Sequence, residues 1–88
     1  MEVVFARLFL KDLQNISDKK LKSEVVQAIE EFESAQSLLE LSNIKKMRGY
    51  SEAYRLRIGK YRLSFYCDGL TVKLARFVKR ETIYKLFP

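Results

Sequence analysis

Apolar residues recur at two different periods along the 88-residue chain, and the period changes near residue 52. Before this point the spacing is three or four residues, which places the apolar side chains on one stripe of a helix. The clearest example is a helix whose apolar stripe consists of Leu21, Val25, Ile29 and Phe32. Ser17 or Asp18 is suited to cap its first turn, and we expect it to end between residues 34 and 37 as the second helix of the chain.

The segments on either side of this helix are shorter. VVFARLF, residues 3–9, begins as a strand and runs into a first helix over about residues 8–16, because Leu8, Leu13 and Ile16 lie at roughly helical spacing. SLLELSNIKKM, residues 37–47, is ambiguous and is compatible with one helical turn followed by an extended approach to Gly49.

After Glu52 the chain alternates between apolar and polar residues, as half-buried strands do. Gly59-Lys60 fits a type II′ hairpin turn with glycine at its first central position, and Asp68-Gly69 fits a type I′ turn that leads into LTVKLARFV. These turns predict three consecutive antiparallel strands. The residues expected to face the helices as core are Tyr54, Leu56, Ile58, Leu63, Phe65, Val72 and Leu74.

The turns also predict the register of the strands. The first places Arg57 opposite Arg62 and Arg55 opposite Ser64. The second, with residue 67 opposite 70, places residue 62 opposite 75 and residue 64 opposite 73. The side chains expected together on the sheet face away from the helices are Arg55, Arg57, Arg62, Ser64, Tyr66, Lys73 and Lys79.

Arg57 and Arg62, if directly opposite, repel each other at a cost of a few tenths to about 1 kcal/mol. A bound polyphosphate would compensate for this repulsion. Two other interpretations stay open on the pattern alone: the arginines are solvated, or carboxylates of another chain pair with them.

Length and composition narrow the class of protein. The chain suffices for one α+β domain over residues 1–88, and its 48% apolar and 12% aromatic residues argue against disorder. No apolar run is long enough for a signal peptide or a membrane span, so we expect a cytoplasmic protein without membrane contact. A lone cysteine and no histidine make a metal site or an internal disulfide unexpected.

The net charge of +6 is unevenly distributed. The residues up to 44 carry five bases and eight acids, whereas the remainder carries twelve bases and three acids. Such an asymmetry favours a polyanionic partner for the second part, most often a nucleic acid.

The segment NIKKMRGYSEAYRLRIGKYRLSFY, followed after a further strand by VKRETIYKLFP, resembles the RelE/ParE superfamily of toxins from bacterial toxin–antitoxin operons. The resemblance covers nearly the whole chain, and its most specific part is the hairpin Y-R-x-R-x-G-x-Y-R. It implies a small twisted antiparallel sheet of about four strands, with two N-terminal helices on one face and a short C-terminal helix. It also implies that the first strand joins this sheet.

RelE-like members cleave messenger RNA in the decoding site of the ribosome, without a metal or other cofactor, by attack of a 2′-hydroxyl on the neighbouring phosphate. The resemblance assigns Arg62 to the scissile phosphate and Tyr84 to stacking or proton transfer, although Tyr84 could equally pack the final turn. The positions that match the family are Arg55, Arg57, Arg62, Arg80 and Tyr84. With Lys79 added as a hypothesis of our own, the candidate catalytic set is Arg57, Arg62, Lys79, Arg80 and Tyr84, and the candidate RNA-binding set is Lys45, Lys46, Arg48, Arg55 and Lys73.

The chain departs from the family at the general base. Many relatives have a hairpin lysine or a histidine before the final arginine, but these positions hold arginine and Lys79. Arginine is a poor base because its pKa exceeds about 12. Neighbouring cations could lower the pKa of a lysine, so Lys79 is the first hypothesis for the base and Glu81 the second.

Three functions stay open on the sequence. The first is a ribosome-dependent mRNA endonuclease, the second a ParE-like inhibitor of DNA gyrase, and the third a non-catalytic module that binds nucleic acid or antitoxin. The resemblance implies an antitoxin as protein partner, which either covers the basic face or blocks entry to the ribosome by its bulk.

Overall fold

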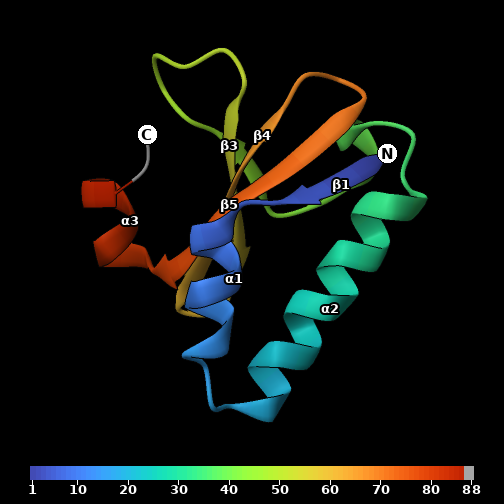
Figure 1. Cartoon of the computed structure of the whole chain (residues 1–88). Helices are drawn as coiled ribbons and strands as arrows, with labels where there is room; N and C mark the ends of the chain where they lie inside the picture. Colours follow the sequence, from blue (N-terminus) through green and yellow to red (C-terminus); the bar gives the residue numbers. More distant parts are fainter. Residues whose placement is uncertain (87–88) are drawn as a thin grey trace.

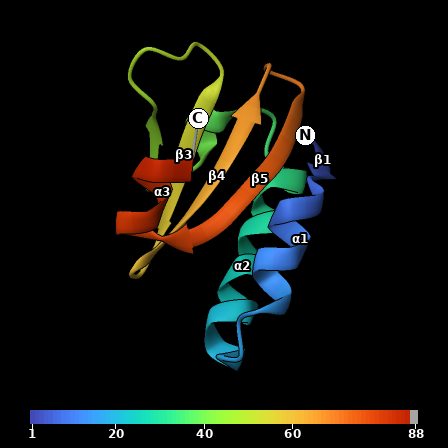
Figure 2. The same cartoon turned by 60° about the vertical axis from the view of Figure 1, so that its left-hand side comes forward.

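The computed structural model describes residues 1–86 and contains a single sheet with helices on both faces (Figures 1 and 2). The elements follow one another as β1 (Glu2–Phe5), α1 (Arg7–Gln14), α2 (Lys19–Ser34), a 3-10 turn η1 (Leu38–Glu40), β2 (Ile44–Lys46), β3 (Ala53–Ile58), β4 (Tyr61–Cys67), β5 (Thr71–Lys79) and α3 (Arg80–Leu86). None of these helices is both long and apolar enough to cross a membrane.

The sheet has five strands in the order β1-β5-β4-β3-β2 within the described chain. The strands β2 to β5 are antiparallel neighbours, whereas β1 lies parallel to β5. The first strand therefore joins the sheet as expected, and the α+β class is confirmed. The additional strand is β2, whose three residues belong to the segment that was ambiguous from sequence.

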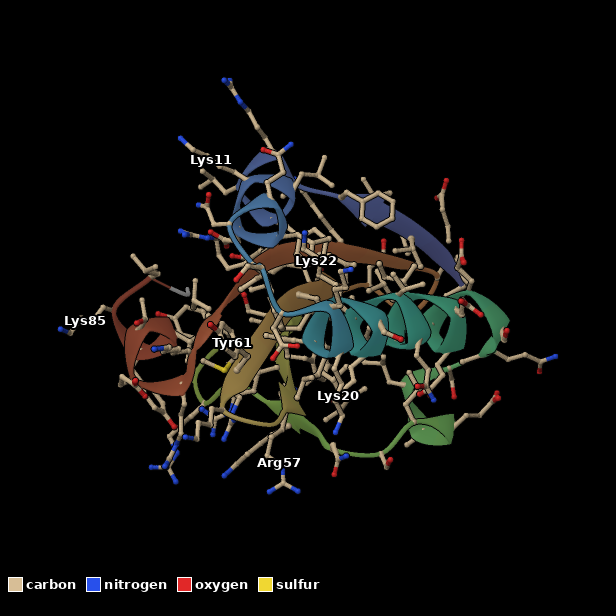
Figure 3. The ribbon with its side chains drawn as sticks, turned by 90° about the horizontal axis from the view of Figure 1, so that it is seen from below. Lys11, Lys20, Lys22, Arg57, Tyr61 and Lys85 are labelled. Atoms are coloured by element: carbon tan, nitrogen blue, oxygen red, sulfur yellow. The ribbon has the colours of Figure 1, made fainter. Side chains whose placement is uncertain are left out.

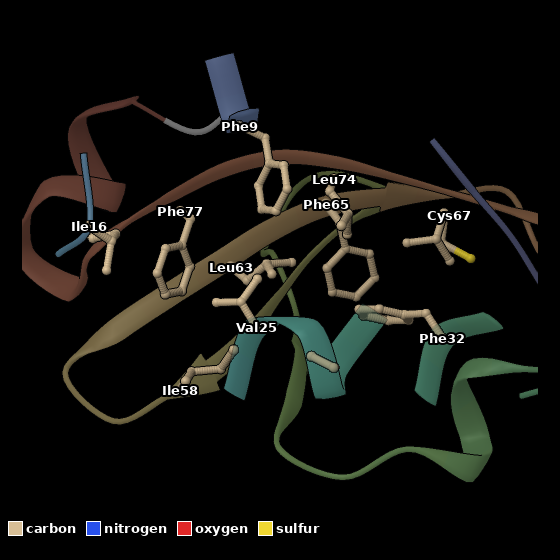
Figure 4. Close-up of a cluster of buried hydrophobic side chains, with 12 residues drawn as sticks. Phe9, Ile16, Val25, Phe32, Ile58, Leu63, Phe65, Cys67, Leu74 and Phe77 are labelled. Carbon is tan, nitrogen blue, oxygen red and sulfur yellow. The ribbon is translucent and has the colours of Figure 1, made fainter. Parts of the chain in front are cut away.

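The main core lies between the sheet and the pair α1 and α2 (Figure 4). We call the side of the sheet that faces this core the helix face. Phe32 of α2 meets the ring of Phe65 edge-on, with the ring centroids 4.9 Å apart. Asp18 caps α2 by accepting hydrogen bonds from two backbone N–H groups of its first turn. All seven predicted core residues of the sheet belong to this cluster, with Tyr54 and Leu56 only partly buried.

The first hairpin has the predicted register. Arg57 lies opposite Arg62, and Arg55 lies opposite Ser64. Gly59 has a φ of +59°, while the second central residue of the turn has no positive φ, as a type II′ turn requires. The turn therefore places the three arginines on one side of the sheet, which we call the arginine face.

The second hairpin differs from the prediction. Cys67 pairs with Val72 rather than with Leu70. A type I′ turn needs positive φ at both central residues, and Asp68 does not have one. Its carboxylate instead accepts hydrogen bonds from the N–H groups of Leu70 at 3.0 Å and Thr71 at 2.8 Å. These side-chain hydrogen bonds stabilise a loop longer than the predicted two-residue turn, because they satisfy the backbone N–H groups of Leu70 and Thr71 within the loop.

A β-bulge shifts the register further along β5. Phe65 lies opposite Leu74 but Ser64 lies opposite Arg76, so Ala75 is the extra residue. The predicted pairs 62–75 and 64–73 are therefore wrong, and Arg62 lies opposite Val78. The placement of Lys79 on the arginine face is also wrong, because Lys79 pairs with Tyr61, whose ring stacks on Phe77 of the main core.

A second, smaller core holds α3 on the arginine face, away from α1 and α2 (Figure 2). Ile83 of α3 is fully buried against Ala53 and Ala75. Small side chains at these two positions leave room for the isoleucine, and the bulge supplies one of them. The backbone N–H of Arg80 also donates to the carbonyl of Lys60, which ties the start of α3 to the β3–β4 turn.

Candidate functional site

Cationic side chains from three strands and from α3 meet on the arginine face. They line a pocket of about 520 Å³, which we call the arginine pocket, and no acidic residue lines it within residues 1–86. A concave site of this size and sign suits a phosphate-bearing ligand. Its lining residues are Asn43, Ile44, Lys45, Arg55, Arg57, Arg62 and Arg80.

The strands bring these side chains together because of their register. Lys45 of β2 pairs with Arg55 of β3, so both side chains point to the same face. Asn43 precedes β2 with a φ of +64°, a conformation that asparagine tolerates better than most residues, and its carbonyl accepts from the N–H of Arg57 at 3.0 Å. This contact continues the pairing of the two strands to the edge of the pocket.

Arg62 lies among the other cations and is partly buried. Its Nη1 donates to the carbonyls of Gly59 at 3.0 Å and Tyr61 at 2.9 Å, which holds the guanidinium at the β3–β4 turn. Burial lowers the pKa of Arg62, and repulsion from the three other arginines, Arg80 foremost, lowers it further. Burial and the neighbouring arginines both disfavour the charged form of Arg62, whereas a bound anion would favour it. The charges around Arg62 therefore favour the binding of a phosphate.

Tyr84 lies on the exposed side of α3 and reaches the first hairpin strand. Nη1 of Arg55 donates to its hydroxyl oxygen at 2.8 Å, and the guanidinium carbon lies 5.2 Å from the centre of its ring. Hydrogen bonding from Arg55, followed by that from Arg80, lowers the pKa of Tyr84. The phenol therefore ionises more readily than a free tyrosine and stands next to the arginine pocket.

The remaining residues that the sequence proposed for catalysis or RNA binding lie outside the arginine pocket. Lys79 and Lys46 lie opposite Tyr61 and Tyr54 respectively, which belong to the helix face, so neither lines the arginine pocket. Arg48 lies in the exposed β2–β3 loop. Lys73 is exposed opposite Tyr66, outside the residues that line the pocket.

Two features that support the site were not identified from the sequence. Asn43 was not assigned a role, although asparagine before an extended segment is a signal for a left-handed residue. Ile83 was also missed, since a single buried isoleucine in a short terminal helix gives no periodic signal. One hint was available, because the small apolar residues Ala53 and Ala75 stand two positions from Arg55 and Lys73 and so belong to the same predicted polar face of the sheet.

Comparison with known proteins places this geometry in a family. No protein-family model matches the chain. The chain is 37% identical over 89 residues to the toxin RelE3 of Methanocaldococcus jannaschii, and the match covers all of both chains. A second protein of that organism, named as RelE1, is 32% identical over 78 residues, which is 86% of each chain.

Solved structures agree with this similarity. A RelB–RelE antitoxin–toxin complex from Methanococcus jannaschii matches with a TM-score of 0.81 and 34% identity, covering 97% of this chain and 99% of the other. An archaeal RelE–RelB complex from Pyrococcus horikoshii shares the fold, with a TM-score of 0.71 at 19% identity over 90% and 93% of the two chains.

The fold and the cationic face thus define a small toxin of the RelE/ParE type. Within this class, the full-length match at 37% identity shows that the chain belongs to the RelE family of toxins from toxin–antitoxin systems.

Proposed function

We propose that this toxin is a ribosome-dependent endoribonuclease that cleaves messenger RNA and thereby inhibits translation. The observation that carries the proposal is the arginine pocket, in which Arg55, Arg57, Arg62 and Arg80 converge beside a tyrosine of lowered pKa. In the proposed reaction the 2′-hydroxyl of one nucleotide attacks the next phosphate. The products are a 2′,3′-cyclic phosphate and a free 5′-hydroxyl.

Arg62 is the proposed ligand of the scissile phosphate. Its Nη1 is occupied by two carbonyls, so the rest of its guanidinium remains available for a charge-assisted hydrogen bond. Arg57 and Arg80 add positive charge where the pentacoordinate phosphorane would gain negative charge. Donors held in place before the reaction stabilise such a transition state more effectively than mobile ones, and each typically contributes about 10²- to 10³-fold in rate.

Tyr84 is the proposed proton acceptor for the 2′-hydroxyl. Its lowered pKa increases the fraction of phenolate, and a general base works best when its pKa lies near the working pH. Lys79, the first hypothesis from sequence, belongs by register to the other side of the sheet, and Glu81 does not line the arginine pocket. The leaving 5′-oxygen takes its proton from solvent in this scheme.

A neutralising antitoxin is the proposed protein partner. Support comes from the solved relatives, which are toxin–antitoxin complexes. An acidic segment that covers the arginine pocket would remove the repulsion among its cations and exclude RNA at the same time. An antitoxin bound elsewhere would instead block entry to the ribosome by its bulk, and the two modes differ in whether Arg57→Gln weakens the complex.

The proposal is tested by incubating the purified toxin with ribosomes programmed with a defined message. We expect cleavage that requires ribosomes, products with a 5′-hydroxyl, and no cleavage when a 2′-deoxynucleotide replaces the nucleotide before the cut. An intact message together with inhibited supercoiling by DNA gyrase would instead support the ParE-like function.

A further inference from the structure

The departing 5′-oxygen is the reacting atom that no side chain serves in the proposed cleavage. When its bond to phosphorus breaks, this oxygen keeps the electron pair and becomes an alkoxide, about as strong a base as hydroxide, since water has a pKa of about 15.7. Water at neutral pH is a weak acid, and a positioned proton donor typically accelerates such a step by about 10²- to 10⁴-fold. A donor in the arginine pocket would therefore improve on transfer from solvent.

Most side chains of the arginine pocket are unsuited to this transfer. Four of the lining residues are arginines, which hold their protons throughout a reaction because the pKa of arginine exceeds about 12. Ile44 is apolar, and Asn43 carries only an amide. A lysine ammonium gives up a proton far more readily than a guanidinium does. The remaining lining residue, Lys45, is therefore the one suitable donor among the described residues that line the pocket.

Lys45 and Tyr84 reach the pocket from opposite sides of Arg55. Across the sheet, Arg55 of β3 lies between Lys45 of β2 and Ser64 of β4. Ser64 is fully buried, because α3 covers this part of the arginine face, whereas Lys45 is exposed on the outermost strand. Tyr84, which belongs to α3, therefore approaches from the β4 side, and Lys45 approaches from the edge formed by β2.

This arrangement suits an in-line displacement at phosphorus. The attacking and departing oxygens lie on opposite sides of the phosphorus atom, so the proton acceptor and the proton donor have to stand apart. Lys45 and Arg62 belong to strands that are separated only by β3, which is a distance of about 10 Å between the strands at the usual spacing. Because both residues line one pocket, the ammonium of Lys45 can approach a phosphate that Arg62 holds.

No carboxylate competes for Lys45. The one ion pair within residues 1–86 joins Asp12 to Arg76, and no acidic residue of that range lines the arginine pocket. Glu24 and Glu31 of α2 line a neighbouring hollow, which shares Arg57 with the pocket but does not include Lys45. The ammonium of Lys45 is therefore available to a substrate.

We propose that Lys45 donates the proton to the 5′-oxygen, a role that deepens the proposed function and rests on it. The 2′-hydroxyl gives its proton to the Tyr84 phenolate while the 2′-oxygen forms its bond to phosphorus. The bond between phosphorus and the 5′-oxygen breaks, its electron pair stays on the oxygen, and the ammonium of Lys45 supplies the proton of the new 5′-hydroxyl. One turnover leaves a neutral phenol and a neutral amine, and solvent carries the proton from the phenol back to the amine.

The test combines two variants of Lys45 with two defined messages on programmed ribosomes. Lys45→Met removes the charge together with the proton, whereas Lys45→Arg keeps the charge but not a readily released proton. One message is ordinary RNA, and the other carries sulfur in place of the 5′-oxygen at the cleavage site. A departing thiolate needs no proton donor, because a thiol has a pKa of only about 8.5. Single-turnover rates at saturating concentrations report the chemical step rather than binding.

On the ordinary message, both variants should lose about 10²- to 10⁴-fold in rate. On the sulfur message, the parent and both variants should agree within about threefold, because the leaving group no longer needs an acid. Arg62→Gln should be slow on both messages, since its proposed role is to hold the phosphate. Lys45 is exposed, so neither of its substitutions disturbs the core.

Lys11→Met provides the control for the loss of one positive charge. Lys11 is exposed on α1, and Figure 3 shows Lys11 and Arg57 on opposite sides of the molecule. This variant should cleave both messages at the parental rate. A parental rate for Lys45→Arg on the ordinary message would overturn the proposal, because Lys45 would then contribute only its charge.

Slow cleavage of the sulfur message by both Lys45 variants would also overturn the proposal, since the defect would then not concern the leaving group. Failure of the parent protein to cleave either message is a different result. It would contradict the proposed function itself, and the role of Lys45 would fall with it.

Discussion

Replacing Ile83 with alanine should detach α3 from the arginine face while leaving the main core folded. Ile83 is fully buried, but its cluster contains only two other buried residues, Ala53 and Ala75, and is separate from the core under α1 and α2. Loss of a buried isoleucine side chain costs about 2 to 5 kcal/mol, and we expect the lower half of this range because alanine neighbours provide few contacts. A seven-residue helix is not stable by itself, so the cost falls on its docking to the sheet.

A loss of about 3 kcal/mol shifts the docking equilibrium of α3 by about a hundredfold. Tyr84 then leaves Arg55, and its pKa should return from its lowered value toward about 10. Tyrosine NMR with ¹³C at the ring carbon next to the hydroxyl resolves this titration, and Tyr84→Phe assigns the signal. In the parent, docking should tighten as the pH rises from the lowered pKa of Tyr84 toward 10, because the docked state holds the phenolate more strongly than the free helix does.

The conservative variant Ile83→Val provides the control, since it removes one carbon and should cost about 0.5 to 1.5 kcal/mol. It should retain the lowered pKa of Tyr84 and most of the cleavage activity. The reasoning is refuted if Tyr84 keeps its lowered pKa in Ile83→Ala. It is also refuted if Ile83→Ala lowers the melting temperature as much as Leu63→Ala in the main core, because α3 would then not be a separately docked element.

Three further predictions follow from the arginine face and from the contact between α1 and β5. Arg57→Gln should raise the free energy of unfolding by about 0.5 kcal/mol, because it removes the like-charge pair, and should weaken RNA binding; a denaturation curve showing destabilisation would contradict this. Asp12→Ala should lower the free energy of unfolding by about 1 to 3 kcal/mol, because the guanidinium of Arg76 and the N–H of Phe77 both lose their partner. The prediction is contradicted if this free energy falls no further than it does when an exposed glutamate is replaced by alanine. The rate of message cleavage should rise with pH through the lowered pKa of Tyr84 and then level off, and this rise should be absent in Tyr84→Phe; the same profile in both proteins would remove Tyr84 from proton transfer.

The sequence predicted those parts of the fold that depend on local signals. The stripe of α2, the cap at Asp18 and the type II′ turn at Gly59 are all encoded within a few residues, and each is present. The turn was enough to place Arg57 opposite Arg62. The central part of the candidate site was therefore accessible without a structure.

The errors arose where one distant or irregular contact decides the geometry. Asp68-Gly69 has the composition of a type I′ turn, but the Asp68 carboxylate binds two backbone N–H groups and lengthens the loop. The bulge at Ala75 then shifts every later pair, which places Lys79 on the helix face. An alternation of apolar and polar residues does not reveal a single inserted residue such as Ala75. For this reason the sequence suggested Lys79 as the general base, whereas we propose Tyr84.

The sequence also did not indicate how α1 is joined to the sheet. Strand β1 ends at Phe5, which leaves the outer edge of β5 without a strand partner from about residue 76 onward. Asp12 covers this edge by accepting from the N–H of Phe77 at 3.0 Å and from the guanidinium of Arg76. Arg76 therefore has a structural role, although it was counted from sequence among the cations of the basic second part.

The central claim, that the arginine pocket is the site of RNA cleavage, is tested most directly by comparing two substitutions of equal charge on the same sheet face. Arg62→Gln removes the proposed phosphate ligand, whereas Lys73→Gln removes an exposed cation outside the pocket. The measurement is the single-turnover rate of message cleavage on programmed ribosomes, with both variants at concentrations that saturate binding. We expect a loss of about 10²- to 10³-fold for Arg62→Gln and less than about threefold for Lys73→Gln. Equal losses in the two variants would contradict the claim, since they would show that only the overall charge of the face contributes to the reaction.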